Sequence, residues 1–180
     1  MKNGGKVLFL ILSLHAAMLT AAAQNYALGT FHSFKGLGLA AEIPSLKPKD
    51  FNTLVIYADM AGMYLGNDTT PGVKINFSHN ARIVDFEPKT LDGLSLFAGA
   101  GFSTGWVSDS GREDFGLCGA LSGSFGARAI FECGLILTLG LTIETGGLLY
   151  NDRGVFKSSL YSSGIFQTPL PHLTLSYRFK

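Results

Sequence analysis

The sequence predicts an all-β fold: an antiparallel up-and-down transmembrane β-barrel of eight strands, placed after a cleaved signal peptide. Three observations carry this prediction. Apolar and polar side chains alternate with a period of two along most of the chain, turn-forming residues separate the alternating segments, and the N-terminus has the residue order of an export signal. No segment beyond the N-terminal one carries a helical period.

The first residues predict export. Lys2 and Lys6 precede an apolar stretch over residues 7–19, and the small residues 21–23 follow it. This is the order of a secretory signal peptide, and the stretch is shorter than the roughly 20 residues that a membrane-spanning helix needs. We therefore expect residues 1–23 to be removed as a signal peptide.

We expect residues 24–180 to form one barrel domain. The composition of the chain is unusual for a soluble protein. Charged residues make up 15% of the sequence, against roughly 25% in ordinary soluble proteins, and the mean hydropathy is +0.28. Beyond the signal no run approaches the roughly 18 apolar residues of a transmembrane helix, so the hydrophobicity is spread by alternation. Without the two signal lysines, basic and acidic residues are nearly balanced, which argues against a nucleic-acid partner.

The strands are predicted from the alternation and the turns from Gly, Pro, Asn and Asp. The clearest alternating segments are 37–43, 53–60, 73–78, 94–106, 135–144 and 173–179. Turn signals lie at 44–50, 66–72, 87–93, 108–114, 131–134, 150–154 and 168–172. Residues 117–131 and 155–166 are rich in Gly and Ser, so their strand boundaries are less sharply defined. Residues 26–43 fit either one long strand or a hairpin folded near Lys35 and Gly36, and this choice decides whether the count is eight or more.

The alternation has two unlike faces, and their chemistry predicts which one points outward. One face is apolar, whereas the other is mostly Gly, Ser, Thr and Asn with about one charge per strand, too few charges for a solvated surface. The segments are close to the roughly 9 to 11 residues with which a tilted strand crosses a membrane. Aromatic residues gather near strand ends, where a barrel places its interfacial girdles: Trp106, Phe115, Phe131, Tyr150 and Phe179. We expect the apolar face to meet lipid.

The inward face then carries a set of ionisable residues that we expect to form a polar network inside the barrel. They are Glu42, Asp59, Lys74, Arg128, Glu144 and Arg178. An eight-stranded barrel is only wide enough for side chains to fill, so opposite charges are expected to pair across the lumen and plug it. A structural polar core is favoured over a gated conduit, because an unpaired buried charge is costly while a satisfied network rigidifies the barrel.

With its signal, its glycine-rich alternating strands and the closing segment "LTLSYRF", the chain resembles the small outer-membrane β-barrel proteins of Gram-negative bacteria, the OmpA/OmpX-like class. The resemblance implies location in the cell outer membrane, contact with outer-membrane lipid, and recognition of the last strand by the barrel-assembly machinery. The residues of that signal would be Leu173, Leu175, Tyr177 and Phe179. Lys180 follows Phe179, so the terminal aromatic is penultimate here, a departure that bears on the strength of the signal and not on the fold.

Catalytic motifs are sparse, and we expect no enzyme, cofactor or metal. The lipid A deacylases, which are also outer-membrane barrels, use a pattern resembling His-x-Ser-Asn, whereas this chain has "FSHN". Ser78 and His79 are adjacent in a strand, so they point to opposite faces and do not form a nucleophile and base pair. His32 and His172 have no neighbouring ligand residues in the sequence.

The two cysteines are expected to remain unbridged. If 131–134 is a hairpin turn, Cys133 lies in the turn and Cys118 lies far up the preceding strand, beyond the separation of about 7 Å that a disulfide tolerates. The function predicted is that of a structural or surface-interaction and adhesion barrel with a filled lumen. Two alternatives stay open: a lipid-modifying barrel enzyme, and a soluble periplasmic barrel that binds an apolar ligand.

Overall fold

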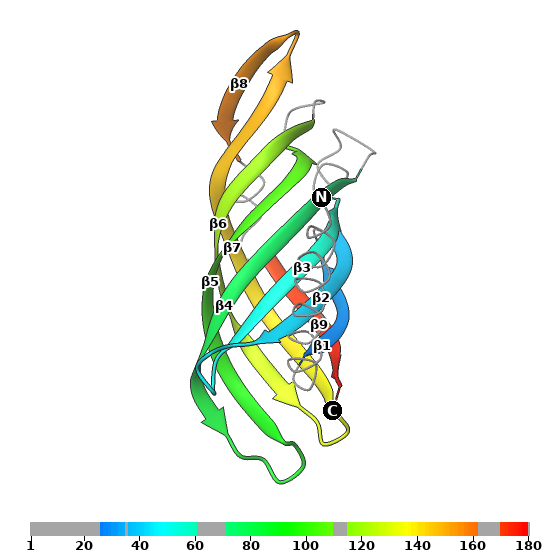
Figure 1. The fold of residues 1–180 in the computed structure, drawn as a ribbon, viewed down its shortest axis with the longest axis vertical. Helices are drawn as coiled ribbons and strands as arrows, with labels where there is room; N and C mark the ends of the chain where they lie inside the picture. The colour runs from blue at the N-terminus through cyan, green and yellow to red at the C-terminus, as the bar shows by residue number, and fades with distance from the viewer. Residues whose placement is uncertain (1–25, 35, 61–70, 110–114, 162–169, 180) are drawn as a thin grey trace, which may run out of the picture.

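In the computed structural model, the described residues are 26–34, 36–60, 71–109, 115–161 and 170–179, and they form nine antiparallel strands without a helix. The strands are β1 Ala27–Ser33, β2 Gly36–Pro44, β3 Phe51–Asp59, β4 Gly72–Phe86, β5 Gly93–Ser108, β6 Phe115–Ile130, β7 Leu135–Asp152, β8 Val155–Leu160 and β9 Leu170–Arg178. The predicted all-β, up-and-down fold is confirmed (Figure 1). Residues 1–23, predicted as a signal peptide, lie outside the described residues.

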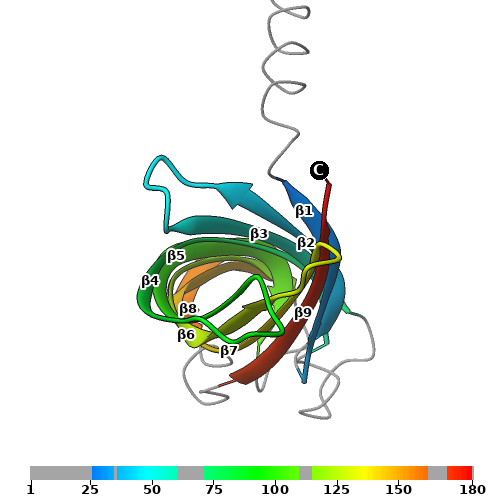
Figure 2. The same ribbon diagram turned by 90° about the horizontal axis from the view of Figure 1, so that it is seen from below.

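The sheet closes on itself through eight strands. Each of β1 to β7 pairs with the next in sequence, and β9 pairs with both β7 and β1. Seen along its axis, the ribbon forms a ring (Figure 2). The hairpin alternative for residues 26–43 is correct, because β1 pairs with β2 from Ala27 opposite Glu42 to Ser33 opposite Gly36.

The ninth strand, β8, is not a further member of the ring. It pairs with the end of β7, from Asp152 opposite Val155 to Gly147 opposite Leu160, while β9 begins opposite Thr142 of the same strand. The other edge of β7 is occupied by β6. Strands β8 and β9 therefore share one edge of β7 and together fill the eighth position in the wall.

The ring is strongly staggered. Following the paired residues from Lys74 in β4 through β3, β2, β1, β9, β7, β6 and β5 leads back to β4 at Asp85, eleven residues further along. One of these residues falls in the register irregularity between Arg82 and Val84. Such a stagger requires strands tilted against the barrel axis, and with eight strands it leaves an interior that side chains fill.

Strands β5, β6 and β7 have 16, 16 and 18 residues, which is longer than the 9 to 11 expected from the sequence. Tilt and stagger lengthen a strand relative to the wall that it crosses, and the β7–β8 hairpin also runs beyond the ring (Figure 1). That hairpin turns through Arg153 and Gly154, with φ of 52° and 88°. A two-residue turn with positive φ at both central residues is the type whose twist matches that of the flanking strands.

The two faces of the wall are oriented as predicted. On β7, Leu139 is 56% exposed on the outside, while its neighbour Thr138 is 9% exposed and faces the interior. Large apolar side chains are exposed on every strand of the ring, among them Leu28, Leu39, Ile56, Val73, Phe102, Leu121, Leu139 and Leu175. Tyr150, predicted for an outer aromatic girdle, instead packs against an interior cluster because its place in the alternation is the inward one.

Candidate functional site in the barrel interior

The first feature of the interior is a buried charged cluster made by Lys74, Glu144, Asp59 and Tyr161, here called the Lys74 cluster. The Lys74 side chain is fully buried and forms a salt bridge with Glu144 across the barrel. Its Nζ also donates to the Tyr161 hydroxyl at 3.2 Å, and that hydroxyl donates to Asp59 Oδ2 at 3.3 Å. The ammonium lies 4.3 Å from the centre of the Tyr161 ring. Strands β4, β7 and β3 and the residue that follows β8 are thereby tied together.

The alternation of β4 explains why a lysine is held here. Val73 and Ile75 are exposed on the outer wall, so Lys74 between them must point inward. An unpaired ammonium at this depth would be strongly destabilising, and the carboxylate of Glu144, also inward on β7, compensates it.

A second ion pair crosses the interior nearer to the end of the ring where β1 begins and β9 ends. Arg128 of β6 forms a two-pronged salt bridge with Glu42 of β2, with Nε at 2.9 Å from Oε2. The guanidinium lies 4.7 Å from the centre of the Phe51 ring, and Phe51 packs edge-on against Phe97 at 5.3 Å. A bidentate arginine–carboxylate pair over an aromatic ring is a rigid arrangement, because the planar fork fixes both partners.

Between the two ion pairs lies a small cavity of about 70 Å³, whose apolar lining comes from Phe31, Ala40, Phe51, Val55, Tyr57 and Phe97. Its hydroxyl and amide lining comes from Thr53, Asn76, Ser78, Asn80, Ser122, Ser124, Thr138, Thr142, Thr174 and Ser176. Several of these groups satisfy one another: Asn76 donates to Ser122 at 3.0 Å, and Ser124 donates to Asn80 at 3.0 Å. A cavity of this size has room for a few water molecules beside its hydroxyl and amide groups.

Five of the six residues predicted for the interior network are therefore joined in two clusters. Asp59, Lys74 and Glu144 meet in one and Glu42 and Arg128 in the other. Arg178 also faces inward, in register with Ala27 and through it with Glu42, but its buried Nε has no hydrogen-bond partner among the described residues.

Two interior residues escaped the sequence prediction of the network. Tyr161 follows a segment without clear alternation, so nothing in the sequence indicated that its ring is fully buried. For His172 the sequence did contain an indication, because the alternation of the closing strand places it on the inward face with Thr174 and Ser176. Its Nδ1 lies 3.3 Å from Thr142 Oγ1, and its ring occupies space left by Gly140, where a Cβ would lie 2.5 Å from the ring.

The Ser78 and His79 side chains face opposite sides of the wall, as predicted. Ser78 is 7% exposed and lines the cavity, whereas His79 points outward, with Nδ1 at 2.8 Å from Asn52 Oδ1 and Nε2 at 3.5 Å from Asp50. The predicted separation of the cysteines is also confirmed: Cys118 is buried in β6, Cys133 is exposed in the β6–β7 turn, and neither forms a disulfide.

The residues of the predicted assembly signal lie on the outer side of β9. Leu175, Tyr177 and Phe179 are 43%, 49% and 49% exposed, and Leu173 is half-buried. The rings of Tyr177 and Phe179 pack edge to face at 5.6 Å.

These features define a closed antiparallel β-barrel with an apolar outer wall and a polar, internally paired interior. Within the described ranges there is no cluster of three His, Cys, Asp or Glu side chains that could hold a metal ion. The same ranges contain no helix of the length and apolarity needed to cross a bilayer, a finding that bears on helices alone. No protein-family model matches the chain, and no curated protein or solved structure is detectably similar to it.

Proposed function

We propose that this chain is a small integral outer-membrane β-barrel protein with a structural or surface-interaction role, exported by residues 1–23. The observation that carries the proposal is the distribution of side chains across a closed wall. Apolar side chains are exposed on the outside of all eight ring strands, while the buried set includes Lys74, Arg128, Glu144 and Asp59. A water-soluble barrel has the opposite distribution, and the bilayer is the solvent that favours this one.

Closure of the ring supports the same proposal. In hydrocarbon each unsatisfied backbone N–H or C=O group costs several kcal/mol, so a sheet in lipid must have no open edge. The pairing of β9 with β1 removes that edge over Ala27–Ser33.

The lengths of the connections favour one orientation. On the side where β1 begins and β9 ends, the connections β2–β3, β4–β5 and β6–β7 have six, six and four residues. On the other side β1–β2 and β5–β6 have two and six, but the two longest connections lie there: β3–β4 has twelve residues and β7–β9 has seventeen, including β8. In outer-membrane barrels short turns lie in the periplasm and longer loops outside. We assign the turn side to the periplasm and the β7–β8 hairpin to the cell surface.

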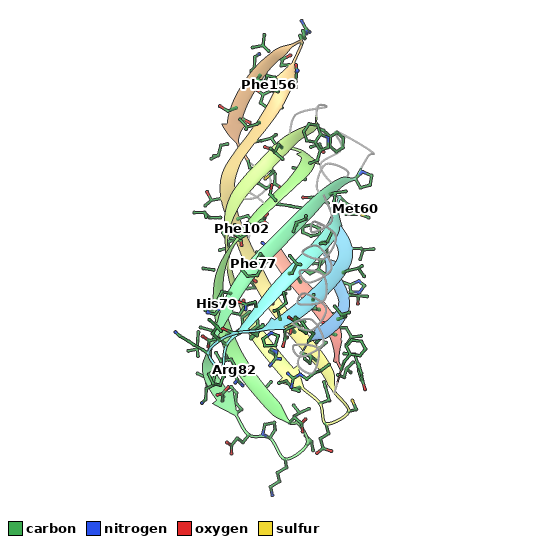
Figure 3. All side chains as sticks on the ribbon, in the orientation of Figure 1. Met60, Phe77, His79, Arg82, Phe102 and Phe156 are labelled. Atoms are coloured by element: carbon green, nitrogen blue, oxygen red, sulfur yellow. The ribbon has the colours of Figure 1, made fainter. Side chains whose placement is uncertain are left out.

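The β7–β8 hairpin supports a surface-interaction role in that orientation. All six side chains of β8 are exposed or half-buried, and Phe156 is 83% exposed (Figure 3). Strand β8 pairs with β7 alone among the described strands. The backbone N–H and C=O groups along its other edge can therefore pair with a strand of a partner.

The resemblance to OmpA/OmpX-like proteins enters here as part of the proposal. It assigns Leu173, Leu175, Tyr177 and Phe179 to recognition by the barrel-assembly machinery. Their exposure on the outer side of the closing strand is compatible with such recognition before the ring closes.

The cavity gives no support to binding of an apolar ligand, because its volume of about 70 Å³ is far below the roughly 300 to 1,000 Å³ of ligand pockets. The opposite facing of Ser78 and His79 likewise gives no support to acyl hydrolysis.

The test is fractionation of cells that express the full chain. A carbonate wash should leave the protein in the membrane pellet, and the unboiled protein should migrate differently from the boiled chain on a gel. A periplasmic protein released by osmotic shock serves as the control. Recovery of the chain in the soluble fraction would overturn the proposal.

A further inference from the structure

The β2–β3 turn, residues 45–50, forms a groove against the outer side of the barrel. The groove has a volume of about 630 Å³ and is lined by residues that include Tyr26, Leu46, Lys47, Asn52 and His79. In Figure 3, His79 lies on the wall beside this turn, well above the turn that joins β4 to β5. The groove is therefore on the side of the wall and not on its lower tip.

The turn is held in place by one internal hydrogen bond and by several contacts with β4. Asp50 N–H donates to Lys47 O at 3.1 Å, and the Asp50 carboxylate lies 3.5 Å from His79 Nε2. Lys49 pairs with Asp85 at 3.3 Å, and the Arg82 guanidinium donates to the carbonyls of residues 48 and 49. The groove is thus built into the fold before any ligand arrives.

The groove lies at the border of the apolar wall. The outward positions next to Asn52 and His79 on their strands are Leu54 and Phe77, which are paired with each other. Tyr26 precedes the exposed Leu28 by two residues, and its carbonyl accepts the Phe179 N–H at 3.2 Å. Tyrosine at the edge of an apolar band is typical of the level of lipid headgroups.

The charge of the groove indicates the kind of ligand that it would bind. Lys49 and His79 each have a carboxylate neighbour, but no carboxylate among the described residues forms an ion pair with Lys47. Next to Lys47, the Leu46 side chain is fully exposed. A free ammonium beside an apolar side chain suits the boundary where phosphate groups meet acyl chains.

We propose that this groove binds the phosphate headgroup of an anionic phospholipid in the leaflet that faces the turn side. Lys47 contacts the phosphate, the Tyr26 hydroxyl donates to it, and Leu46 lies among the acyl chains that cover Leu54 and Phe77. The inference rests on the proposed function, because it requires lipid around this wall. In the orientation assigned above, the leaflet is the periplasmic one.

The test compares two lysines of the same turn. The purified full-length barrel is titrated in detergent with phosphatidylglycerol or with phosphatidylcholine of the same chains, and bound lipid is counted by native mass spectrometry. Lys47→Gln should lower binding of phosphatidylglycerol about fivefold, the effect of one lysine at an anionic surface, and Lys49→Gln should change it less than twofold. Phosphatidylcholine binding should be the same in all three proteins.

Equal losses of phosphatidylglycerol binding in the two variants would indicate a general charge effect and overturn the site. A wild-type protein that binds the two lipids equally well would also overturn it. Heat-modifiable gel mobility and insertion into phosphatidylcholine vesicles are measured on the same samples. Normal insertion without a lipid preference overturns the groove alone, whereas failure of the wild-type chain to insert overturns the proposed function with it. Tyr26→Phe, which removes only the hydroxyl, should lower the preference without affecting insertion.

Discussion

Replacing Glu144 by Gln tests the buried charge pairing directly. The substitution keeps the size and shape of the side chain but removes the negative charge that compensates Lys74. The Lys74 side chain is fully buried, and that of Glu144 is 8% exposed. After the change, the lysine keeps the uncharged Tyr161 hydroxyl at 3.2 Å and the ring below it, and the Asp59 carboxylate is linked to it through that hydroxyl.

The expected loss follows from this burial. Removing one partner of a buried ion pair costs about 3 to 5 kcal/mol, and we expect the lower end, about 3 kcal/mol, because glutamine still accepts a hydrogen bond. Replacing both partners, Lys74→Met with Glu144→Leu, and adding Asp59→Asn so that the cluster carries no charge, should return most of that stability. Asp152→Asn breaks the exposed pair with Lys157 on the hairpin and should cost less than about 1 kcal/mol.

The assay is urea-induced unfolding of the protein reconstituted in lipid vesicles. The sequence has a single tryptophan, Trp106, whose side chain is 56% exposed on the outer wall, so its fluorescence reports loss of contact with lipid. A loss below about 1 kcal/mol for Glu144→Gln, or a triple variant without the three charges that is as unstable as Glu144→Gln, would refute the reasoning that the charges must compensate each other.

Further predictions concern the wall, a turn and the closing strand. Leu139→Arg should lower the unfolding free energy by about 2 to 4 kcal/mol in vesicles, whereas Thr138→Ser should be nearly silent; an unchanged Leu139→Arg protein would mean that the faces are reversed. Gly154→Ala places a side chain at φ 88° and should lower the unfolding free energy by about 1 kcal/mol in the same assay. An unchanged unfolding free energy would contradict the assigned turn. Removal of residues 173–180 should leave an exported but unassembled chain that is degraded, because the ring then stays open. Phe179→Ala should only slow the appearance of the heat-modifiable form after pulse labelling; normal assembly kinetics and yield of the truncated chain would contradict the assigned role of the last strand.

The orientation of the wall could be predicted from sequence because strand side chains alternate strictly. Once one residue such as Lys74 is recognised as inward, its neighbours Val73 and Ile75 must be outward, and the same rule applied to each strand gave the interior set. Pairing partners could not be predicted in this way. That Lys74 meets Glu144 and Arg128 meets Glu42 depends on the stagger of the ring, which alternation within a strand does not encode.

Other features escaped prediction because they do not follow the period of two. Tyr161 comes after the last residue of β8, where the chain leaves the regular ladder, yet its ring is placed beneath Lys74. The contact of the β2–β3 turn with β4 depends on Arg82 and Asp85, which are remote from the turn in sequence, and Arg82 borders the register irregularity. Tyr150 was misassigned to the outside because aromatic residues near strand ends occur on both faces.

The shared edge of β7 separates two tasks within one strand. Residues 135–142 pair with β9 and close the ring, whereas residues 147–152 pair with β8 in the hairpin. Changes in the length or sequence of the hairpin tip therefore leave every closing pair between β7 and β9 in the same register. In the proposed membrane setting, such a barrel can alter what it presents beyond the membrane without rebuilding the ring, and the tip is accordingly the natural place to graft a foreign peptide for display.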